Sequence, residues 1–499
     1  MSIQIARRVI SFGLVGLSLA PTKHAQEPVG DALEKPRPNI LFCIADDWGW
    51  PHAGALGDKV VRTPNFDRIA REGALFPHAY VSSPSCTPSR NAILTGQWHW
   101  RLKEGANLWS TLDPKTPVYP KLLEAAGYHV GHWRKSWGPG RLKAWDGHPA
   151  GRAFKGGFEG FLAARPDDEP FCFWLGAYDP HRPYKEGAGE AAGLDPSSIE
   201  LFPFFPDCPE VRGDVADYYH EVGQFDADVG RALALLEERG ELENTIVVMT
   251  GDHGMPFPRC KGNVYDCGAR VPLAIRWGAE ADAGQVHEGF VSLTDLAPSF
   301  LAAAGVELPS VMTGRSLLPQ LRGDENDSRG FVLIGRERHT PAQEKPQGGG
   351  YPVRALRTHD YLYVRNYEPT RWPAGTPSHE LAYKGSGWLG DCDNGPTKFV
   401  IAARRELDEE FTRSWELCFG KRPAEELYDL KTDPHQLVNL ALEPELSEQR
   451  LKMSEQLTLE LTRSGDPREL GGAEAFDSYP YFGGIPSYPG DDVLEAYRE

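Results

Sequence analysis

The sequence predicts an α/β protein with a large, mainly parallel sheet covered by helices on both faces and a smaller second domain toward the C-terminus. Apolar runs of strand length alternate with amphipathic segments of helical period. Uninterrupted apolar strands are typical of parallel sheets that are buried on both faces. The length of 499 residues exceeds one ordinary core. A polar, glycine-rich stretch near residue 345, followed by several short strands, marks the expected second domain.

The expected elements follow in order along the first part of the chain. Strands are predicted at residues 39–45, 171–178 and 245–250, which are continuous apolar runs. Short helices are predicted at 64–73 and 117–127, each closed by a glycine. A long helix is predicted over 214–240, where apolar side chains recur at three-to-four spacing. We interpret this stripe as core: Val215, Tyr218, Tyr219, Val222, Val229, Leu233 and Leu236.

Three parts are expected in the chain: an export signal at 1–26, a catalytic domain over 36–345, and a C-terminal subdomain over 346–499 with an antiparallel sheet and an irregular tail. Arg7 and Arg8 precede a short apolar core, which is typical of an export signal and too short to span a membrane. No later apolar stretch is long enough for a span. We therefore expect a periplasmic or secreted protein without a membrane span.

Net charge and cysteine content limit the binding partners and the disulfide content that we expect. The net charge of -18 argues against a nucleic-acid partner and requires local basic groups wherever an anion binds. Eight cysteines in a chain of this length do not form a disulfide scaffold. Cys260 and Cys267 flank Lys261, so a bridge between them is one option and free thiols are the other.

The segment Ser83–Arg90, continued to Gly96, carries the strongest functional signal. Pro88 suits a first helical turn and Gly96 suits a helix end, so Cys86 is expected at the start of a helix. The amide groups and dipole of a helix N-terminus favour anions. Arg90, one turn later, is expected to offer a forked donor to tetrahedral oxygens such as those of sulfate or phosphate.

Acidic pairs follow two of the predicted strands. Asp46 and Asp47 come directly after residues 39–45, and Asp252 and His253 follow residues 245–250. Ligands bind at the carboxyl ends of strands in open α/β sheets. Adjacent carboxylates repel unless a cation lies between them, and oxygen donors suit calcium or magnesium. For either pair alone, an ordinary turn or helix cap is the alternative.

The pattern Cys-Thr-Pro-Ser-Arg followed by Leu-Thr-Gly at residues 86–96 resembles the signature of the type I sulfatases, whose cysteine is oxidised to formylglycine. The resemblance implies an alkaline-phosphatase-like fold, a large mixed sheet flanked by helices with a smaller C-terminal α+β domain. It implies that Cys86 becomes the nucleophile through a formylglycine-generating enzyme. It also implies a metal site, with calcium preferred over magnesium, formed by Asp46, Asp47, Cys86, Asp252 and His253.

The same resemblance assigns roles to three basic residues. His181, in Pro-His-Arg-Pro, matches the histidine that protonates the leaving group. Lys261 matches a lysine that binds sulfate, and Lys135 matches a catalytic lysine. Trp137 departs from the pattern, because the family has a histidine there and an indole cannot act as a base. Three explanations are open. His132 or a water molecule takes over the role of the family histidine, the second chemical step is slower, or the pocket differs from that of the family.

Substrate contacts are expected from an aromatic and basic cluster after the nucleophile segment and from two later residues. They are Trp98, His99, Trp100, Arg101, Lys103 and Trp109, with Arg338 and His339. The alternative for the cluster is a loop that packs on its own aromatic rings. Residues 179–182, 252–258 and 351–354 resemble motifs of the heparan N-sulfatase branch.

The resemblance implies a sulfatase that cleaves a sulfate ester or N-sulfate of a sulfated oligo- or polysaccharide. A phosphate or phosphonate monoester hydrolase and a glycan-binding pseudoenzyme are the alternatives.

Overall fold

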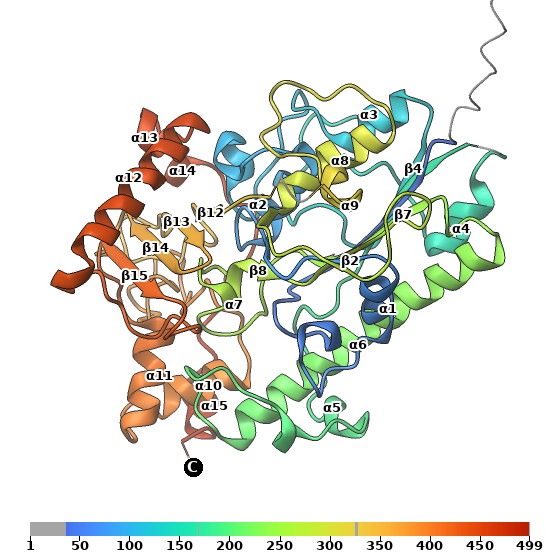
Figure 1. The fold of residues 1–499 in the computed structure, drawn as a ribbon. Coiled ribbons are helices and arrows are strands. Elements are labelled where there is room, and N and C mark those ends of the chain that lie inside the picture. The colour runs from blue at the N-terminus through green and yellow to red at the C-terminus, as the bar shows by residue number, and fades with distance from the viewer. Residues whose placement is uncertain (1–35, 168, 325–327, 499) are drawn as a thin grey trace, which may run out of the picture. The chain divides into compact units, whose positions relative to one another are not determined.

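The computed structural model describes residues 36–167, 169–324 and 328–498. Residues from Arg37 onward form one compact unit, drawn in Figure 1. The export signal expected at 1–26 lies outside the described residues. No helix in the described part of the chain combines the length and the apolar character that a membrane span requires.

An eight-stranded sheet forms the centre of this unit, in the order β10-β2-β9-β7-β1-β6-β4-β5. Its central strands β7, β1, β6 and β4 run parallel, and β9 is antiparallel to β7. This arrangement confirms the predicted large mixed sheet. The strands are β1 (Asn39–Ala45), β2 (Ala74–Leu75), β4 (His129–Trp133), β5 (Arg152–Ala153), β6 (Phe171–Gly176), β7 (Thr245–Gly251), β9 (Leu273–Arg276) and β10 (Gln285–Val286).

The three predicted strands lie side by side at the centre of the sheet. β1, β6 and β7 are buried along their whole length, as their continuous apolar sequences require. In the register of the sheet, Ala45 at the end of β1 pairs with Gly251 at the end of β7. Because these strands are parallel, the acidic residues that follow them emerge at the same edge.

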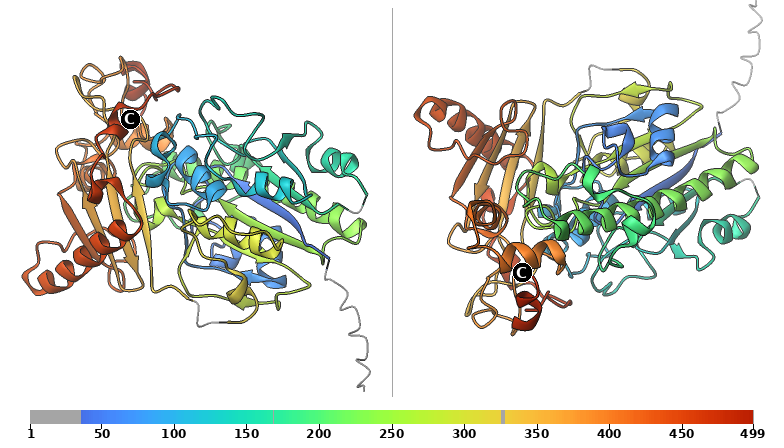
Figure 2. Two further views of the ribbon diagram at one scale, coloured as in Figure 1. Left: turned by 90° about the horizontal axis from the view of Figure 1, so that it is seen from above. Right: turned by 90° about the horizontal axis from the view of Figure 1, so that it is seen from below.

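Helices cover both faces of the sheet, as the ribbon views show (Figures 1 and 2). One face carries α1 (Pro64–Glu72), α4 (Gly157–Ala164) and the long α6 (Pro209–Glu238). The other carries α2 (Cys86–Thr95), α3 (Tyr119–Ala125) and α8 (Leu296–Ala303). The predicted stripe of α6 is buried throughout. This helix begins five residues before the predicted start, because Pro209 occupies a first-turn position where its missing N–H costs nothing.

A four-stranded antiparallel sheet forms the C-terminal part, in the order β12-β13-β14-β15. Its strands are β12 (Phe331–Arg336), β13 (Val353–Thr358), β14 (Tyr361–Asn366) and β15 (Glu425–Asp429). The helix α12 (Ser447–Arg463) packs against β13 and β14. Because β12 precedes residue 346, the sheet contains strands from both sides of the expected domain boundary.

Smaller elements complete the described chain. A three-stranded sheet contains β3 (Ala79–Tyr80), β8 (Arg270–Val271) and β11 (Val291–Ser292). The helices α10 (Pro396–Ala403) and α11 (Glu409–Phe419) lie between β14 and β15 in sequence, and α10 packs against α6. Short helices are α5 (Ala188–Ala191), α7 (Asp266–Ala269), α9 (Leu318–Leu321), α13 (Pro467–Leu470), α14 (Ala475–Ser478) and α15 (Asp491–Glu495).

Candidate active site

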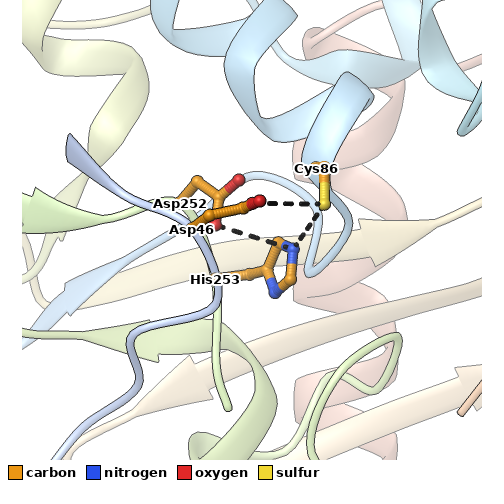
Figure 3. A group of neighbouring side chains, drawn as sticks. All are labelled: Asp46, Cys86, Asp252 and His253. Atoms are coloured by element: carbon orange, nitrogen blue, oxygen red, sulfur yellow. Dashed lines mark hydrogen bonds and ion pairs between the residues drawn. The ribbon is translucent and has the colours of Figure 1, made fainter. Parts of the chain in front are cut away.

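Helix α2 presents Cys86 to the carboxyl edge of the central strands. The helix begins at Cys86 after an extended Ser85, and it ends before Gly96, whose φ of 62° is the left-handed conformation that glycine accepts. The Cys86 Sγ lies 3.2 Å from Nε2 of His253 and 3.6 Å from Oδ1 of Asp46. Figure 3 shows these side chains converging with Asp252. The encoded thiol therefore faces both strand-end pairs.

The acidic pairs are joined to each other. The backbone N–H of Asp47 donates to Oδ1 of Asp252 at 2.9 Å, and Nε2 of His253 lies 3.1 Å from Oδ1 of Asp47. Nδ1 of His253 lies 3.0 Å from the carbonyl oxygen of Gly254. Because a carbonyl only accepts, Nδ1 carries a proton and Nε2 faces the acidic residues. A neutral imidazole in this orientation can bind a metal ion through Nε2.

Each of the three carboxylates has a cationic neighbour. Lys135 Nζ lies 2.6 Å from Oδ1 of Asp46, and Lys261 Nζ lies 2.8 Å from Oδ2 of Asp47. Arg90 Nε donates to Oδ2 of Asp252 at 2.8 Å. Burial by itself would raise the pKa of the Asp252 carboxyl, but His253 and Arg90 lower it well below its usual range. Asp252 is therefore ionised at neutral pH.

The donor set fits a divalent cation. Ligand atoms of Asp46, Cys86, Asp252 and His253 all lie within 4.8 Å of one another, and all four residues are buried. Carboxylate oxygens are the ligands that calcium and magnesium prefer. Asp46 and Asp252 are the two carboxylates of this group, and Asp47, whose Oδ1 lies 3.1 Å from Nε2 of His253, groups with His181 and Asp393. A cation between the carboxylates would add to the compensation that their cationic neighbours already give.

Arg90 is less free than the sequence led us to expect. Its guanidinium is fully buried, and besides Asp252 it binds the carbonyl oxygens of Lys135 at 2.6 Å and Ala45 at 3.3 Å. Gly176 makes the close approach of Lys135 possible, because a Cβ at residue 176 would lie 1.9 Å from that carbonyl oxygen. Arg90 thus ties the end of β1 to the segment that carries Lys135.

His181 lies in the same neighbourhood, together with Asp393, an acidic residue that no sequence motif indicates. A ring nitrogen of His181 and carboxylate oxygens of Asp47 and Asp393 lie within 4.8 Å of one another. Lys261 Nζ lies 2.7 Å from Oδ2 of Asp393. The sequence around residue 393 offers only turn signals, Gly-Asp-Cys-Asp-Asn-Gly-Pro, so its position depends on tertiary structure.

Of the expected substrate-contact residues, His339 adjoins the segment that carries Cys86. Its Nδ1 lies 2.8 Å from Oγ of Ser85, the residue before Cys86. Burial, followed by the charges of Lys261 and Arg336, holds the pKa of His339 well below its usual range. His339 is therefore a neutral ring at the site.

The tryptophans of the expected cluster lie elsewhere. Trp98 and Trp100 stack with ring centroids 5.1 Å apart inside a core formed with the C-terminal sheet and α12. His99 is fully buried, with Nδ1 2.8 Å from Oγ of Ser82. These rings are packed in a core and do not face a sugar. Their packing agrees with the alternative, a segment that packs on its own aromatic rings.

The other expected substrate-contact residues either bind backbone carbonyl groups of the protein or are exposed to solvent. Arg338 is buried and donates to the carbonyl oxygens of residues 477, 479 and 480, so it holds the C-terminal tail. Arg101 and Lys103 are exposed, and Arg101 donates to the carbonyl oxygen of Ser464. Trp109 is half-buried, and its carbonyl accepts from the N–H of Phe482.

Trp137 occupies the position where the family has a histidine, and His132 is one expected replacement for that histidine. The Nε1–H of Trp137 donates to Oδ1 of Asn91 at 2.7 Å, which seats the indole against α2. His132 stacks on His148 with ring centroids 4.1 Å apart, and its Nδ1 lies 3.1 Å from the carbonyl oxygen of Gly151. These contacts hold the His132 ring between His148 and Gly151.

All eight cysteines are free thiols in the structure. The optional bridge between Cys260 and Cys267 is thus not formed. Cys267 instead donates to the carbonyl oxygen of Arg259 at 3.5 Å. Both thiols are buried, where neutral sulfur packs as a small apolar group.

Comparison with known proteins identifies relatives over most of the chain. The chain is 29% identical to human N-sulphoglucosamine sulphohydrolase over 87% of its own length and 91% of that protein. It is 26% identical to an ulvan-active sulfatase of Formosa agariphila over 88% of its length and 77% of that protein.

Solved structures share the fold at lower identity. BT4656, solved in complex with its substrate D-glucosamine-2-N,6-O-disulfate, aligns with a TM-score of 0.61 at 20% identity, over 86% of this chain and 98% of that one. The phosphonate monoester hydrolase SpPMH of Silicibacter pomeroyi aligns with a TM-score of 0.61 at 20% identity, over 87% and 97%.

The class that the fold and these relatives define is that of hydrolases acting on sulfate esters. The chain belongs to the Sulfatase family, whose model matches residues 38–306, more than half of its length.

Proposed function

We propose that this protein removes sulfate from a sulfated carbohydrate, with a formylglycine derived from Cys86 as nucleophile and a divalent cation in the site. Ester or N-linked sulfate groups of an oligo- or polysaccharide are the substrate. The observation that carries the proposal is the convergence of the Cys86 side chain on the acidic strand-end pairs. The Sγ lies between 3.2 and 3.9 Å from His253, Asp46 and Asp47.

Cys86 is poorly suited to act as an unmodified thiol. Burial raises the pKa of Cys86 well above its usual value, although Lys135 opposes the shift. The thiolate is the nucleophilic form of cysteine, so a neutral buried thiol is a weak nucleophile. Oxidation to formylglycine would place aldehyde hydrate oxygens where the sulfur now lies and supply the nucleophile. A formylglycine-generating enzyme is the partner that this maturation requires.

The side chains of this chain would divide the remaining work. Asp46, Asp47, Asp252 and His253 would hold the cation, which supplies Lewis-acid stabilisation of charge on the sulfate oxygens when bound. Lys135 and Lys261 would bind sulfate oxygens as point charges. His181 would give a proton to the departing oxygen or nitrogen. Its Nδ1 lies 2.6 Å from the carbonyl oxygen of Arg182, which leaves Nε2 for that transfer.

Charge balance does not separate a sulfate ester from a phosphate monoester. The site contains three cations, Arg90, Lys135 and Lys261, against the carboxylates of Asp46, Asp47, Asp252 and Asp393. With a divalent cation and with the proton that His181 would transfer, the site would carry two net positive charges, which suits an anionic ester of either kind. The comparison of turnover numbers decides between them.

Release of sulfate from defined sugars tests the proposal. Protein co-expressed with a formylglycine-generating enzyme and supplied with calcium is incubated with glucosamine 2-N-sulfate, glucosamine 6-O-sulfate and a 4-nitrophenyl sulfate standard. We expect sulfate release that Cys86→Ser abolishes. Faster turnover of 4-nitrophenyl phosphate than of every sulfate would instead show that the protein is a phosphate monoester hydrolase.

Trp137 is the observation that favours the second candidate, a glycan-binding pseudoenzyme. With an indole in place of the family histidine, the site lacks one proton-transfer group. We expect Trp137→His to raise kcat by about 10-fold or more, within the range that a positioned acid or base contributes. Turnover numbers with glucosamine 6-O-sulfate provide the measurement. Tight binding without turnover in both proteins, with formylglycine present, would support the pseudoenzyme.

A further inference from the structure

We propose that Asp393 is a specificity-determining residue that accepts a hydrogen bond from a hydroxyl or N–H group of the sugar beside the scissile sulfate. The inference rests on the proposed function and extends it to the chemistry of the sugar. It predicts a preference for sugars that carry a hydrogen-bond donor next to the sulfate over sulfates that carry none.

The position of Asp393 supports this role. Its carboxylate lies 2.7 Å from Lys261 and in one group with Asp47 and a ring nitrogen of His181. Lys261 is nearly inaccessible, whereas the Asp393 side chain is 23% exposed. Asp393 therefore lies on the outer side of the sulfate-binding lysine. The sugar of a bound substrate must occupy this side, because His181 protonates the leaving group there.

The loop that carries Asp393 is rigidly held. Lys398 is buried, and its Nζ donates to the carbonyl oxygens of Trp388, Leu389 and Cys392 at 3.0, 3.1 and 2.8 Å. The same ammonium donates to Oδ1 of Asn394 at 2.9 Å. A single buried ammonium group thus binds the backbone before residue 393 and the side chain of the residue after it. Such support is what holds a recognition group in place.

Two further contacts fix the loop against the catalytic part. Oδ1 of Asp391 accepts from the backbone N–H of Thr340 at 2.8 Å and from its hydroxyl at 2.6 Å. Gly395 lies against Arg182, because a Cβ there would be 2.5 Å from the guanidinium. Arg182 follows His181 and forms a forked pair with Asp214. The loop that carries Asp393 is therefore fixed in position relative to the segment that carries His181.

The charge state of Asp393 suits an acceptor. Burial alone would raise the pKa of Asp393, but the charge of Lys261, followed by that of His181, holds it far below its usual range. A carboxylate only accepts hydrogen bonds, and those to charged groups are the stronger ones. Sugar hydroxyls and a sulfamate N–H are donors of the required kind. A second sulfate at this place would be repelled.

The test compares substrates with and without a neighbouring donor. Steady-state kinetics of calcium-loaded, formylglycine-containing protein are measured with glucosamine 2-N-sulfate, glucosamine 6-O-sulfate and 4-nitrophenyl sulfate. The proteins are the wild type, Asp393→Asn, Asp393→Glu and the surface control Asp360→Asn. We expect Asp393→Asn to lower kcat/KM for the hydrolysed sugar by about 10- to 100-fold. Its activity on 4-nitrophenyl sulfate should fall by a clearly smaller factor, because only the ion pair with Lys261 changes for that substrate, and Asp393→Glu should recover part of the loss on the sugar.

Equal losses on both substrate types would overturn the proposal, because a residue that only positions Lys261 affects every sulfate alike. Calorimetric titration of Cys86→Ala, with and without Asp393→Asn, by the same sugars gives a second readout that needs no turnover. About 10-fold weaker sugar binding upon loss of the carboxylate supports the proposal, and unchanged binding overturns it. Absence of turnover in the wild type would count against the proposed function, while the titration still decides the role of Asp393.

Discussion

The backbone N–H of Asp47 donates to Oδ1 of Asp252 at 2.9 Å, which joins the ends of β1 and β7 through residues far apart in sequence. The parallel register, with Ala45 beside Gly251, brings the two segments together once both strands enter the sheet. The candidate metal site is therefore a property of strand order, and its acidic residues depend on one another.

Asp252→Asn tests the metal site. The amide keeps the shape of the side chain but removes a charge that a calcium ion and Arg90 both require, so metal content and sulfatase activity should fall together. We expect a loss of activity of at least about 100-fold, comparable to removal of a positioned electrostatic group. Metal analysis by mass spectrometry, beside Asp360→Asn as a surface control, provides the check. Full activity in metal-free Asp252→Asn would show that the site is not catalytic.

Trp100→Ala distinguishes core packing from substrate contact. Trp100 is 1% exposed, stacks on Trp98 and lies beneath the guanidinium of Arg354, 5.0 Å from the ring. Its removal leaves a cavity, and we expect a loss of about 3–5 kcal/mol in the free energy of unfolding. KM for a sulfated sugar should stay unchanged in the folded fraction. Thermal unfolding and steady-state kinetics measure the two effects, and a raised KM with unaltered stability would restore the sugar-stacking role.

Glu221 on α6 is expected to make stability depend on pH. Burial, followed by the neighbouring Asp179, raises the pKa of Glu221 to about 7 from 4.5. Between these values the folded protein holds the proton that the unfolded chain has released, so this residue's stabilising contribution is lost as pH rises. Because the side chain is half-buried, we expect the cost above neutral pH to be about 1 kcal/mol.

Glu221→Gln should remove that cost. The variant should be more stable than the wild type near pH 8 and similar to it near pH 4, where Glu221 is protonated in both states. Thermal unfolding of both proteins at the two pH values measures the difference. An equal difference in melting temperature at both pH values would contradict the assignment.

The sequence predicted the centre of the fold well because its signals are local. The continuous apolar residues 39–45 specify the buried strand β1 with the bounds observed, and the period of α6 identifies its core stripe. The strand-end acidic residues followed from the same reasoning, since parallel strands share an edge. The grouping of Cys86 with them needed the resemblance, because no local pattern relates α2 to β7.

The features that the sequence did not predict depend on contacts between distant segments. Asp393 reaches Lys261 from a loop that Lys398 holds, and no sequence pattern near residue 393 predicts this contact. Trp98 and Trp100 have the composition of a sugar platform, yet the C-terminal sheet covers them. A composition signal cannot tell an exposed ring from one that a later part of the chain buries.

The mass of the Cys86 peptide, in protein co-expressed with a formylglycine-generating enzyme, tests the nucleophile most directly when sulfate release is measured on the same preparation. We expect a peptide that has lost sulfur and two hydrogens and gained one oxygen, with activity proportional to the converted fraction. Activity in protein whose Cys86 remains an intact thiol would show that formylglycine is not the nucleophile.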